Sequence, residues 1–158
     1  MKKIAKFEKV SLTEFLKSGT SATYQQITLP KRATSGSAGY DFFAPEGFTL
    51  APNQTIKIPT GIRVKIDEGW VLKIYPRSSL GFKYKLCLDN TVGIIDSDYY
   101  YADNEGHIFI KMTNRSDTTL EVEQGKAFAQ GVFLEYGITY DDDASEVRTG
   151  GFGSTDKK

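Results

Sequence analysis

The stretch GIIDSDYYYADNEG, residues 93–106, contains the first side chains in this sequence that could carry out chemistry. Its two carboxylates, Asp96 and Asp98, follow an apolar run and precede three consecutive tyrosines. Such a pair can hold a metal ion, activate a water molecule or keep a turn soluble, and loops of this composition most often do only the last. An EF-hand calcium loop is excluded, because Tyr100 and Tyr101 stand where that loop needs an oxygen ligand and a glycine. The apolar run predicts a strand that projects Asp96 from a rigid element, which favours a catalytic role.

The stretch YPRSSLGFK is a candidate anion site. Pro76 ends a predicted strand, and the residues that follow it at the turn are Arg77, Ser78 and Ser79. Hydroxyls and free backbone N–H groups can converge there on an anion, with a guanidinium beside them. Alternatively, either serine could cap a single helical turn that runs to Phe82. The two interpretations are compatible, because a helix N-terminus itself attracts anions.

The glycine-rich stretch RTGGFGST near the C-terminus is a third candidate. It lacks the lysine and the spacing of a P-loop. Its glycines would allow the backbone to approach a ligand closely, while Arg148, Ser154 and Thr155 suit a phosphate. Phe152 is flanked by glycines and is not expected to pack in a core, so its flat ring could stack on a ligand. The alternative is a disordered polar terminus.

Two further polar residues lie in otherwise apolar or small-residue stretches. Asp41 follows the small residues of SGSAGYDFFA, and Gln130 lies within GKAFAQGVF. Each has an ordinary interpretation on its own, the first as a turn acceptor and the second as an outward-facing strand residue. Neither stretch indicates a site by itself.

Composition limits the class of protein. The chain has 158 residues, 20 basic and 20 acidic, which is typical of one soluble domain without the positive field that carries nucleic-acid or membrane-surface binding. The single cysteine, Cys87, cannot form an intramolecular disulfide. The start MKKIAKFEKV lacks the apolar run of a leader, and no stretch approaches the length of a membrane helix. We therefore expect a cytoplasmic protein.

The elements that would position these residues are mostly strands. Only SLTEFLKSG reads clearly as a helix, with Ser11 as N-cap and Glu14 completing a capping box. Short apolar or alternating runs bounded by turn residues predict the strands, which are YQQITL, QTIKIP, IRVKI, WVLKIY, HIFIKM, LEVE and AFAQGVFLEY. Many short strands at this spacing predict an all-β sandwich or small barrel. The end DDDASEVRTGGFGSTDKK predicts a mobile arm.

Taken in order, five stretches resemble the five motifs of the trimeric dUTPase family, the deoxyuridine triphosphate nucleotidohydrolases. They are AGYDFFA, PRSSLG, NTVGIIDSDY, GKAFAQ and RTGGFGST. The resemblance implies a distorted jelly-roll or β-clip subunit with one short N-terminal helix segment. It also implies a homotrimer whose active sites are each built from all three chains. The expected division is an N-terminal strand and helix extension over residues 1–20, a β core over 21–140 and a flexible C-terminal arm over 141–158.

The resemblance implies hydrolysis of dUTP to dUMP and pyrophosphate, which keeps uracil out of DNA and supplies dUMP for thymidylate synthesis. In this family Asp96 would be the general base that activates water for attack on the α-phosphorus. The residues that match phosphate-binding positions are Arg77, Ser78, Ser79, Gln130 and, for the γ-phosphate, Arg148. Asp41 would support the site through waters or through Arg77. Magnesium is the expected cofactor, held by the triphosphate and waters without a direct protein ligand.

The resemblance also assigns residues to the nucleoside. The ring of Tyr99 would pack against the deoxyribose and exclude a 2′-hydroxyl. The residues that would read the uracil edge are Asn90 and the backbone of Gly93, Ile94 and Ile95. From the arm, Phe152 would stack on uracil, with Gly153, Ser154 and Thr155 alongside, so that the arm acts as a lid ordered by substrate.

Three features depart from the family pattern or stay outside it. The residues YYADNE intervene before the glycine at which the family hairpin returns, which predicts a longer turn with Tyr100 and Tyr101 outside the sugar contact. Asp98 is expected only to support this turn. Ala127 stands where many members have a basic residue, and His107, the only histidine, is expected to be structural.

Two alternatives to the hydrolase remain open from the sequence. A dCTP deaminase shares the fold and can also form dUMP, but the intact GIIDSDY and GGFGST stretches favour the hydrolase. A nucleotide-sensing protein with a regulatory protein partner is the other alternative, since some family members of phage origin engage repressors. The tyrosine-rich turn is the feature that could serve such a partner. Direct binding of nucleic acid or membrane is not expected.

Overall fold

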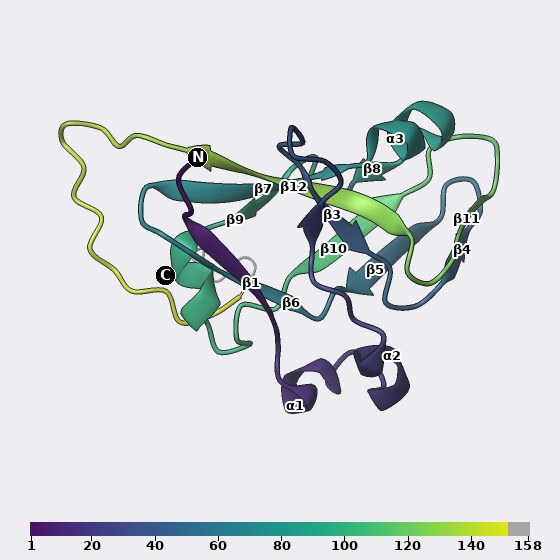
Figure 1. Cartoon of the computed structure of the whole chain (residues 1–158), viewed down its shortest axis with the longest axis horizontal. Coiled ribbons are helices and arrows are strands. Elements are labelled where there is room, and N and C mark those ends of the chain that lie inside the picture. The colour runs from purple at the N-terminus through teal and green to yellow at the C-terminus, as the bar shows by residue number, and fades with distance from the viewer. Residues whose placement is uncertain (152–158) are drawn as a thin grey trace.

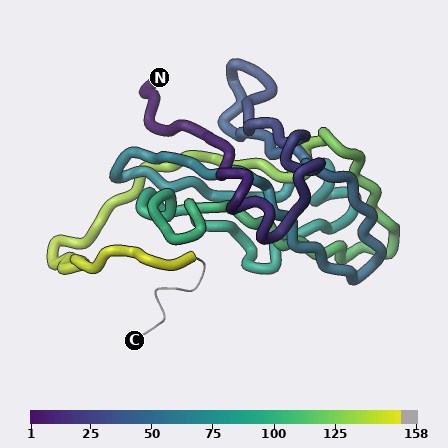
Figure 2. Tube along the Cα trace, turned by 90° about the horizontal axis from the view of Figure 1, so that it is seen from below, coloured from purple at the N-terminus to yellow at the C-terminus, as the bar shows by residue number. Residues whose placement is uncertain are grey.

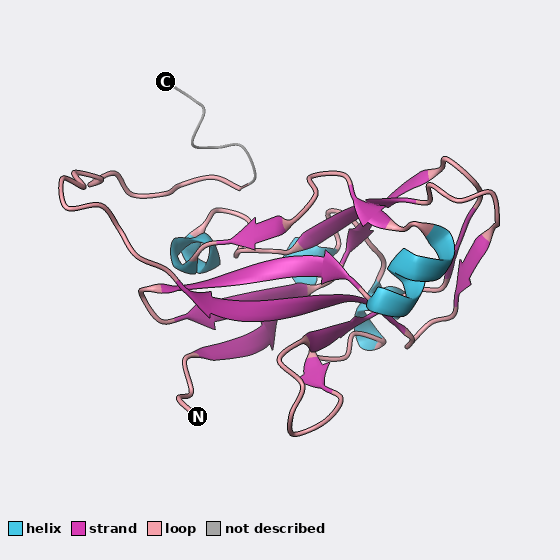
Figure 3. Cartoon of the chain, turned by 90° about the horizontal axis from the view of Figure 1, so that it is seen from above, coloured by secondary structure: helices cyan, strands magenta, loops and turns pink. Residues whose placement is uncertain are grey.

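A computed structural model describes residues 1–151 of the chain. The strands are β1 (Ala5–Lys9), β2 (Lys31–Arg32), β3 (Tyr40–Phe43), β4 (Phe48–Leu50), β5 (Thr55–Pro59), β6 (Ile62–Ile66), β7 (Trp70–Pro76), β8 (Cys87–Leu88), β9 (Gly93–Ile95), β10 (Phe109–Thr113), β11 (Leu120–Val122) and β12 (Ala127–Glu135). The helices are α1 (Leu12–Phe15), α2 (Ser21–Gln25), α3 (Ser78–Tyr84) and the 3-10 helix η1 (Ser97–Tyr101). The strands form the body of the molecule and the short helices lie around it (Figures 1 and 3), which confirms the all-β prediction. No helix in this part of the chain is long and apolar enough to cross a membrane.

The central element is a sheet of five strands in the order β2-β3-β12-β7-β9. The long strand β12 pairs antiparallel with β3 on one side and with β7 on the other, and β9 continues the sheet beyond β7. A second sheet has the order β5-β10-β8, while β1 pairs with β6 and β11 with β4. Because β9 lies at the edge of the five-stranded sheet, one side of its backbone has no strand partner among residues 1–151.

Alternating apolar residues hold these sheets together. In β6 the buried positions are Ile62, Val64 and Ile66, while the residues between them are more exposed. The same period of two places Ile110 and Met112 of β10 in the core. Each fully buried side chain of this size contributes roughly 1.5–3 kcal/mol relative to an exposed one. The alternation of apolar and polar residues therefore predicted these strands because the same alternation buries one face of each strand.

Two local predictions differ from the structure. The stretch YQQITL, expected as a strand, begins inside α2, because the side chain of Thr20 accepts a hydrogen bond from Thr23 N and caps a helix there. The fold therefore has more than the one short helix expected near the N-terminus. The turn after Pro76 also extends beyond Phe82, since α3 continues to Tyr84 and ends where Lys85 adopts a left-handed conformation with φ 48°.

The capping box of α1 is only half formed. The hydroxyl of Ser11 accepts a hydrogen bond from Glu14 N, as predicted. The carboxylate of Glu14 instead accepts one from Lys17 at 2.6 Å. The acceptor for the backbone N–H of Ser11 is Glu105 at 2.8 Å, a residue 94 positions away in the sequence. A long-range contact thus replaces the expected local one.

His107 is fully buried, with an exposed fraction of 0%. Its Nε2 accepts a hydrogen bond from Gly61 N at 2.9 Å, and its ring lies against Phe15 and Phe109. Burial lowers its pKa from 6.5 to about 4. Its position in the core agrees with the structural role that the sequence predicted.

Acid should destabilise the fold through His107. The unfolded chain binds the proton more readily, so the contribution is complete above pH 6.5 and is lost as pH falls toward 4. Between pH 7 and pH 5 we expect a loss of about 2 kcal/mol in the free energy of unfolding from this residue. Urea unfolding at the two pH values, at one protein concentration, should show a smaller loss in a His107→Gln variant. Equal losses in both proteins would contradict the assignment.

Candidate functional site

Three of the predicted phosphate-site residues lie together at one end of the five-stranded sheet. Asp41 of β3 and Gln130 of β12 are direct cross-strand neighbours. Arg77 follows the last residue of β7, and its Nε lies 3.3 Å from Asp41 Oδ1. Gln130 Nε2 donates a hydrogen bond to Pro76 O at 3.1 Å. Stretches that were weak indicators separately therefore form one cluster, in which Asp41 orients the guanidinium and Gln130 holds the end of β7.

The two predicted phosphate-loop serines open α3 beside this cluster. Ser78 and Ser79 are exposed, and the preceding residue, Arg77, is the N-cap. The N-cap is thus Arg77 and neither of the serines, and its side chain makes no capping hydrogen bond. The N–H groups of the first helical turn have no intrahelical acceptor, so they are available to an oxyanion together with the two hydroxyls.

The predicted base lies at the end of β9. This strand pairs with β7, with Ile95 opposite Leu72 and Gly93 opposite Ile74. The next residue, Asp96, has extended backbone and begins η1, and its side chain is half exposed. Asn90 and Ile94 are exposed beside it, whereas Gly93 and Ile95 are buried. The strand thus places Asp96 and its exposed neighbours on a backbone that is held by pairing with β7 and by the buried residues Gly93 and Ile95.

Tyr99 is buried and fixed at its hydroxyl, with an exposed fraction of 3%. The hydroxyl donates to His107 O at 2.5 Å and accepts a hydrogen bond from Asn104 Nδ2 at 2.9 Å. Burial raises the pKa of this phenol, with the bond from Asn104 opposing the shift. Tyr99 is therefore neutral and held rigidly, which suits the sugar contact that the resemblance implies for it.

The other two tyrosines of the run point away from this position. The ring of Tyr100 stacks on the guanidinium of Arg63 at 3.7 Å, and its hydroxyl donates to Glu8 at 2.7 Å. Tyr101 is 69% exposed. Consecutive and identical residues thus have three different environments, as the periodicity of a 3-10 helix requires.

The C-terminal arm returns to the aspartate pair of its own chain. Arg148 Nη2 lies 2.9 Å from Asp96 Oδ2, and Arg148 Nε lies 2.8 Å from Asp98 Oδ1. Asp98 was expected only to support the turn, and this ion pair gives it a further role. Figures 1 and 2 show the chain loop outward after β12 and come back past η1. Four further arm residues were expected at the nucleotide, and they lie outside the described residues: Phe152, Gly153, Ser154 and Thr155.

The two clusters lie at opposite ends of β7. Asp96 follows the residue opposite Leu72, whereas Arg77 follows Pro76 at the far end of the strand. The intervening length of strand corresponds to about 20 Å. In Figure 1, η1 lies beside the last described residues of the arm, and α3 lies at the other side of the sheet. One chain alone therefore does not bring Asp96 next to Arg77.

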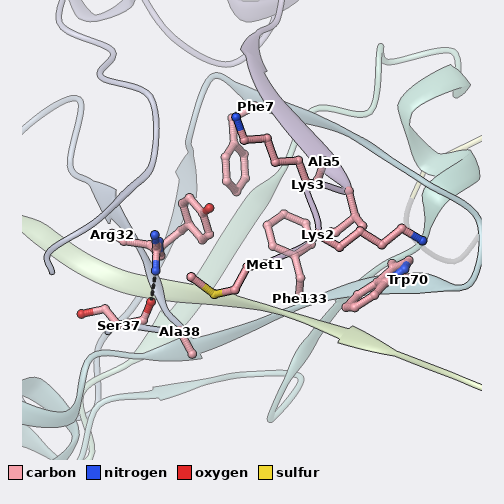
Figure 4. A pocket seen from close by; sticks show the side chains of 12 residues that line it. Met1, Lys2, Lys3, Ala5, Phe7, Arg32, Ser37, Ala38, Trp70 and Phe133 are labelled. Atoms are coloured by element: carbon pink, nitrogen blue, oxygen red, sulfur yellow. Dashed lines mark hydrogen bonds between the residues drawn. The ribbon is translucent and has the colours of Figure 1, made fainter. Parts of the chain in front are cut away.

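A cavity at another place in the described structure lies apart from both clusters. It has a volume of about 720 Å³ and contains none of the predicted site residues. Its walls are aromatic, with Phe7, Trp70 and Phe133 beneath the N-terminal residues (Figure 4). Arg32 at its rim donates to Ser37 O at 3.1 Å. This cavity therefore does not coincide with the predicted site.

Among residues 1–151, no group of three or more His, Cys, Asp or Glu side chains could hold a metal ion. Gly39 was missed, although a Cβ there would lie 2.5 Å from Gln130 Oε1 and would displace the amide from its place in the cluster. Asn104 and Glu105 were also missed, because their partners are set by the folded turn and not by any local pattern.

Comparison with known proteins gives consistent matches. A family profile described as dUTPase matches residues 25–156. The deoxyuridine 5′-triphosphate nucleotidohydrolase of Lactococcus lactis is 46% identical over 132 residues, covering 82% of this chain and 88% of that protein.

Solved structures show the same likeness. A dUTPase from Streptococcus mutans has a TM-score of 0.67 at 36% identity, covering 84% of this chain and 97% of that one. A mutant dUTPase from phage phi11 of S. aureus, whose structure reveals the coordination of a structural Mg(II) ion, has a TM-score of 0.66 at 20% identity, covering 93% and 100%. At that identity the second likeness concerns the fold, and together they confirm the predicted jelly-roll type.

The Asp41–Arg77 pair should matter for anion binding more than for stability. An Asp41→Asn variant removes the carboxylate that orients Arg77, while the pair is too exposed to contribute more than about 1 kcal/mol to folding. We expect binding of inorganic pyrophosphate, measured by calorimetry, to weaken roughly threefold to tenfold. The melting temperature should stay within a few degrees of the parent value. Unchanged pyrophosphate affinity would show that Asp41 does not position Arg77.

Proposed function

This chain belongs to the dUTPase family and hydrolyses dUTP, and we propose that Asp96 is the base of that reaction. The chain is thus a dUTP diphosphatase and not the dCTP deaminase considered as an alternative. The observation that carries the proposal is the position of Asp96, half exposed at the end of a strand anchored on β7. A carboxylate held in this way can orient a water molecule and accept its proton.

In the proposed reaction the water oxygen forms a bond to the α-phosphorus and its proton passes to Asp96. The bond from the α-phosphorus to the oxygen bridging to the β-phosphate breaks, which releases dUMP and pyrophosphate. Groups that bind the triphosphate carry the electrostatic part of the catalysis. These groups are the guanidinium of Arg77, the hydroxyls of Ser78 and Ser79 and the amide of Gln130. Asp41 would support them by holding Arg77.

We infer that the active site needs more than one copy of the chain, in a homotrimer. Asp96 and Arg77 lie at opposite ends of β7, about 20 Å apart along the strand. A triphosphate cannot place its α-phosphorus at one and its terminal phosphates at the other. A site that uses both residues must therefore take Asp96 from one copy and Arg77 from another.

Uracil recognition would use the free side of β9. The outward backbone groups of an edge strand are fixed donors and acceptors, and we assign those of Gly93, Ile94 and Ile95 to the uracil edge together with Asn90. Cytosine would leave such groups unpaired, and close packing would exclude the methyl group of thymine. The rigid ring of Tyr99 would leave no room for a ribose 2′-hydroxyl.

Magnesium would be bound together with the triphosphate. This ion keeps several waters and usually takes one or two carboxylates plus substrate phosphates, so a dedicated set of protein ligands is not required. The carboxylates near the proposed site fit that use, with Asp41 placed to contact a magnesium-bound water. The ion would neutralise charge on the phosphates when it is bound.

The arm would close over the bound nucleotide. We assign Arg148 to the γ-phosphate and Phe152 to the uracil face, with Gly153, Ser154 and Thr155 beside the ligand. Arg148 would then exchange two carboxylates for phosphate oxygens. We place the protein in the cytoplasm, where it would keep uracil out of DNA, and retain residues 1–20, 21–140 and 141–158 as extension, core and arm.

Replacement of Asp96 should separate catalysis from binding. An Asp96→Asn variant keeps the shape of the side chain but cannot accept the proton, so kcat for pyrophosphate release from dUTP should fall by roughly 10²–10⁴. Binding of a non-hydrolysable dUTP analogue should change only a few-fold. Asp117→Asn, at an exposed aspartate outside the site, is the matched control and should be fully active. Normal turnover in Asp96→Asn would exclude this residue as the base.

Mixed trimers should show that the two clusters come from different copies. Chains carrying Asp96→Asn and chains carrying Arg77→Ala, co-expressed with different tags, should form hybrids that hydrolyse dUTP several-fold faster than either parent. In these hybrids an intact Asp96 of one chain can meet an intact Arg77 of another. Hybrids no more active than the parents would mean that both residues act within one chain.

A further inference from the structure

The hydroxyl of Tyr99 is held by two residues that lie beyond the 3-10 helix η1. It donates a hydrogen bond to His107 O at 2.5 Å and accepts one from Asn104 Nδ2 at 2.9 Å. Because a backbone carbonyl can only accept, the phenol proton is directed to His107, and an amide proton of Asn104 is directed to the phenol oxygen. The hydroxyl therefore has one defined acceptor and one defined donor.

The orientation of the Asn104 amide is fixed by the backbone that follows it. Gly106 N donates to Asn104 Oδ1 at 3.1 Å, so the oxygen of the amide faces this N–H and the nitrogen faces Tyr99. His107 N donates to the backbone oxygen of Asn104 at 3.1 Å. An amide turned the other way would bring two donors together at Gly106. Asn104 thus presents its NH₂ group to Tyr99 in one orientation.

The turn of residues 100–105, which contains Asn104, is anchored to the N-terminal part of the chain. Near its end, both oxygens of the Glu105 carboxylate accept hydrogen bonds from Ser11, one from the backbone N–H at 2.8 Å and one from the hydroxyl at 2.5 Å. At its start, the hydroxyl of Tyr100 donates to Glu8 of β1 at 2.7 Å. The turn is therefore held at both ends by side-chain contacts.

The backbone where the turn ends brings Asn104 close to Tyr99. Glu105 and Gly106 are left-handed, with φ values of 60° and 72°. The chain returns so closely that a Cβ at position 106 would lie 2.6 Å from Tyr99 O, a contact that glycine avoids. This close return places the amide of Asn104 within hydrogen-bond distance of a phenol that is five residues earlier in the sequence.

We propose that Asn104 is a positioning residue for the sugar contact, which holds the ring of Tyr99 so that the site accepts a deoxyribose and rejects a ribose. This inference rests on the proposed function for the assignment of Tyr99 to the sugar. Asn104 acts through the phenol and not by touching the nucleotide. It lies outside the five motifs, so the turn of residues 100–105 adds a determinant of specificity that the motifs do not contain.

A ring excludes a 2′-hydroxyl only if it does not yield when the larger sugar enters. The ring of Tyr99 is attached to the backbone through two torsions, about which it can pivot if its far end is free. The bond to His107 O alone allows the hydroxyl to swing about a single acceptor, whereas the bond from Asn104 holds it from a second direction. Loss of the Asn104 bond should therefore make the site more tolerant of ribose.

The ratio of kcat/KM for dUTP to kcat/KM for UTP measures this discrimination. In an Asn104→Ala variant the ratio should fall roughly twofold to tenfold, the range that one neutral hydrogen bond supplies, mainly through better use of UTP. Tyr101→Ala is the matched control, because Tyr101 lies in the same turn and is 69% exposed, and it should keep the parent ratio.

A double variant separates positioning of Tyr99 from general support of the turn. Tyr99→Phe keeps the ring, removes the hydroxyl and leaves the bond between Asn104 and Gly106 in place, so it should lower the ratio at least as much as Asn104→Ala. In the Tyr99→Phe background, Asn104→Ala should then have no further effect on the ratio. An equal fall in both backgrounds would show that Asn104 supports the turn only, and would overturn the proposal.

A Tyr99→Ala variant distinguishes failure of this inference from failure of the proposed function. If Tyr99→Ala leaves the ratio unchanged, Tyr99 does not contact the sugar, and the assignment under the proposed function is wrong. If Tyr99→Ala lowers the ratio but Asn104→Ala and Tyr99→Phe do not, the ring alone discriminates, and the role proposed for Asn104 is wrong.

Discussion

The pairing of β7 with β12 on one side and β9 on the other sets the positions of the two clusters. Its antiparallel register sets Gln130 beside the end of β7, where Arg77 and Asp41 meet. The same strand carries β9, and with it Asp96, at its opposite end. A one-residue change in either register would turn these side chains to the other face of the sheet. The apolar residues buried beneath the sheet therefore fix the site as well as the fold.

The two clusters differ in the number of carboxylates that face each guanidinium. At the cluster of Arg77, one carboxylate faces one guanidinium, whose further N–H groups can donate to an anion. At the other end, one guanidinium is shared by Asp96 and Asp98, so Arg148 offsets part of the repulsion between two acids that are two residues apart. The turn of residues 100–105 meets the arm beside this second arrangement through the hydrogen bond from Asp103 N to Thr149 O.

The sequence could predict what depends on local pattern or on the five motifs. The strands at 62–66 and 70–75 were predicted because alternation directly reflects burial, and Asp41, Arg77 and Gln130 were selected by resemblance before the fold brought them together. The strand predicted over YQQITL was wrong because the cap at Thr20 favours a helix that is too short for its periodicity to show. The bond between Ser11 and Glu105 and the pair between Arg148 and Asp96 join residues 94 and 52 positions apart, which no local rule can detect.

The shortness of β9 has a consequence for how the protein behaves among its own copies. An edge strand with free backbone groups is a template on which another strand can grow, and long apolar edges promote aggregation. β9 has three residues, and it is bounded by Thr91 in a left-handed conformation and by η1. It is too short to recruit a further strand, yet long enough to offer fixed polar groups to a flat ring. The same brevity that protects the sheet edge from other polypeptides leaves its polar groups free for the nucleobase that we assign to them.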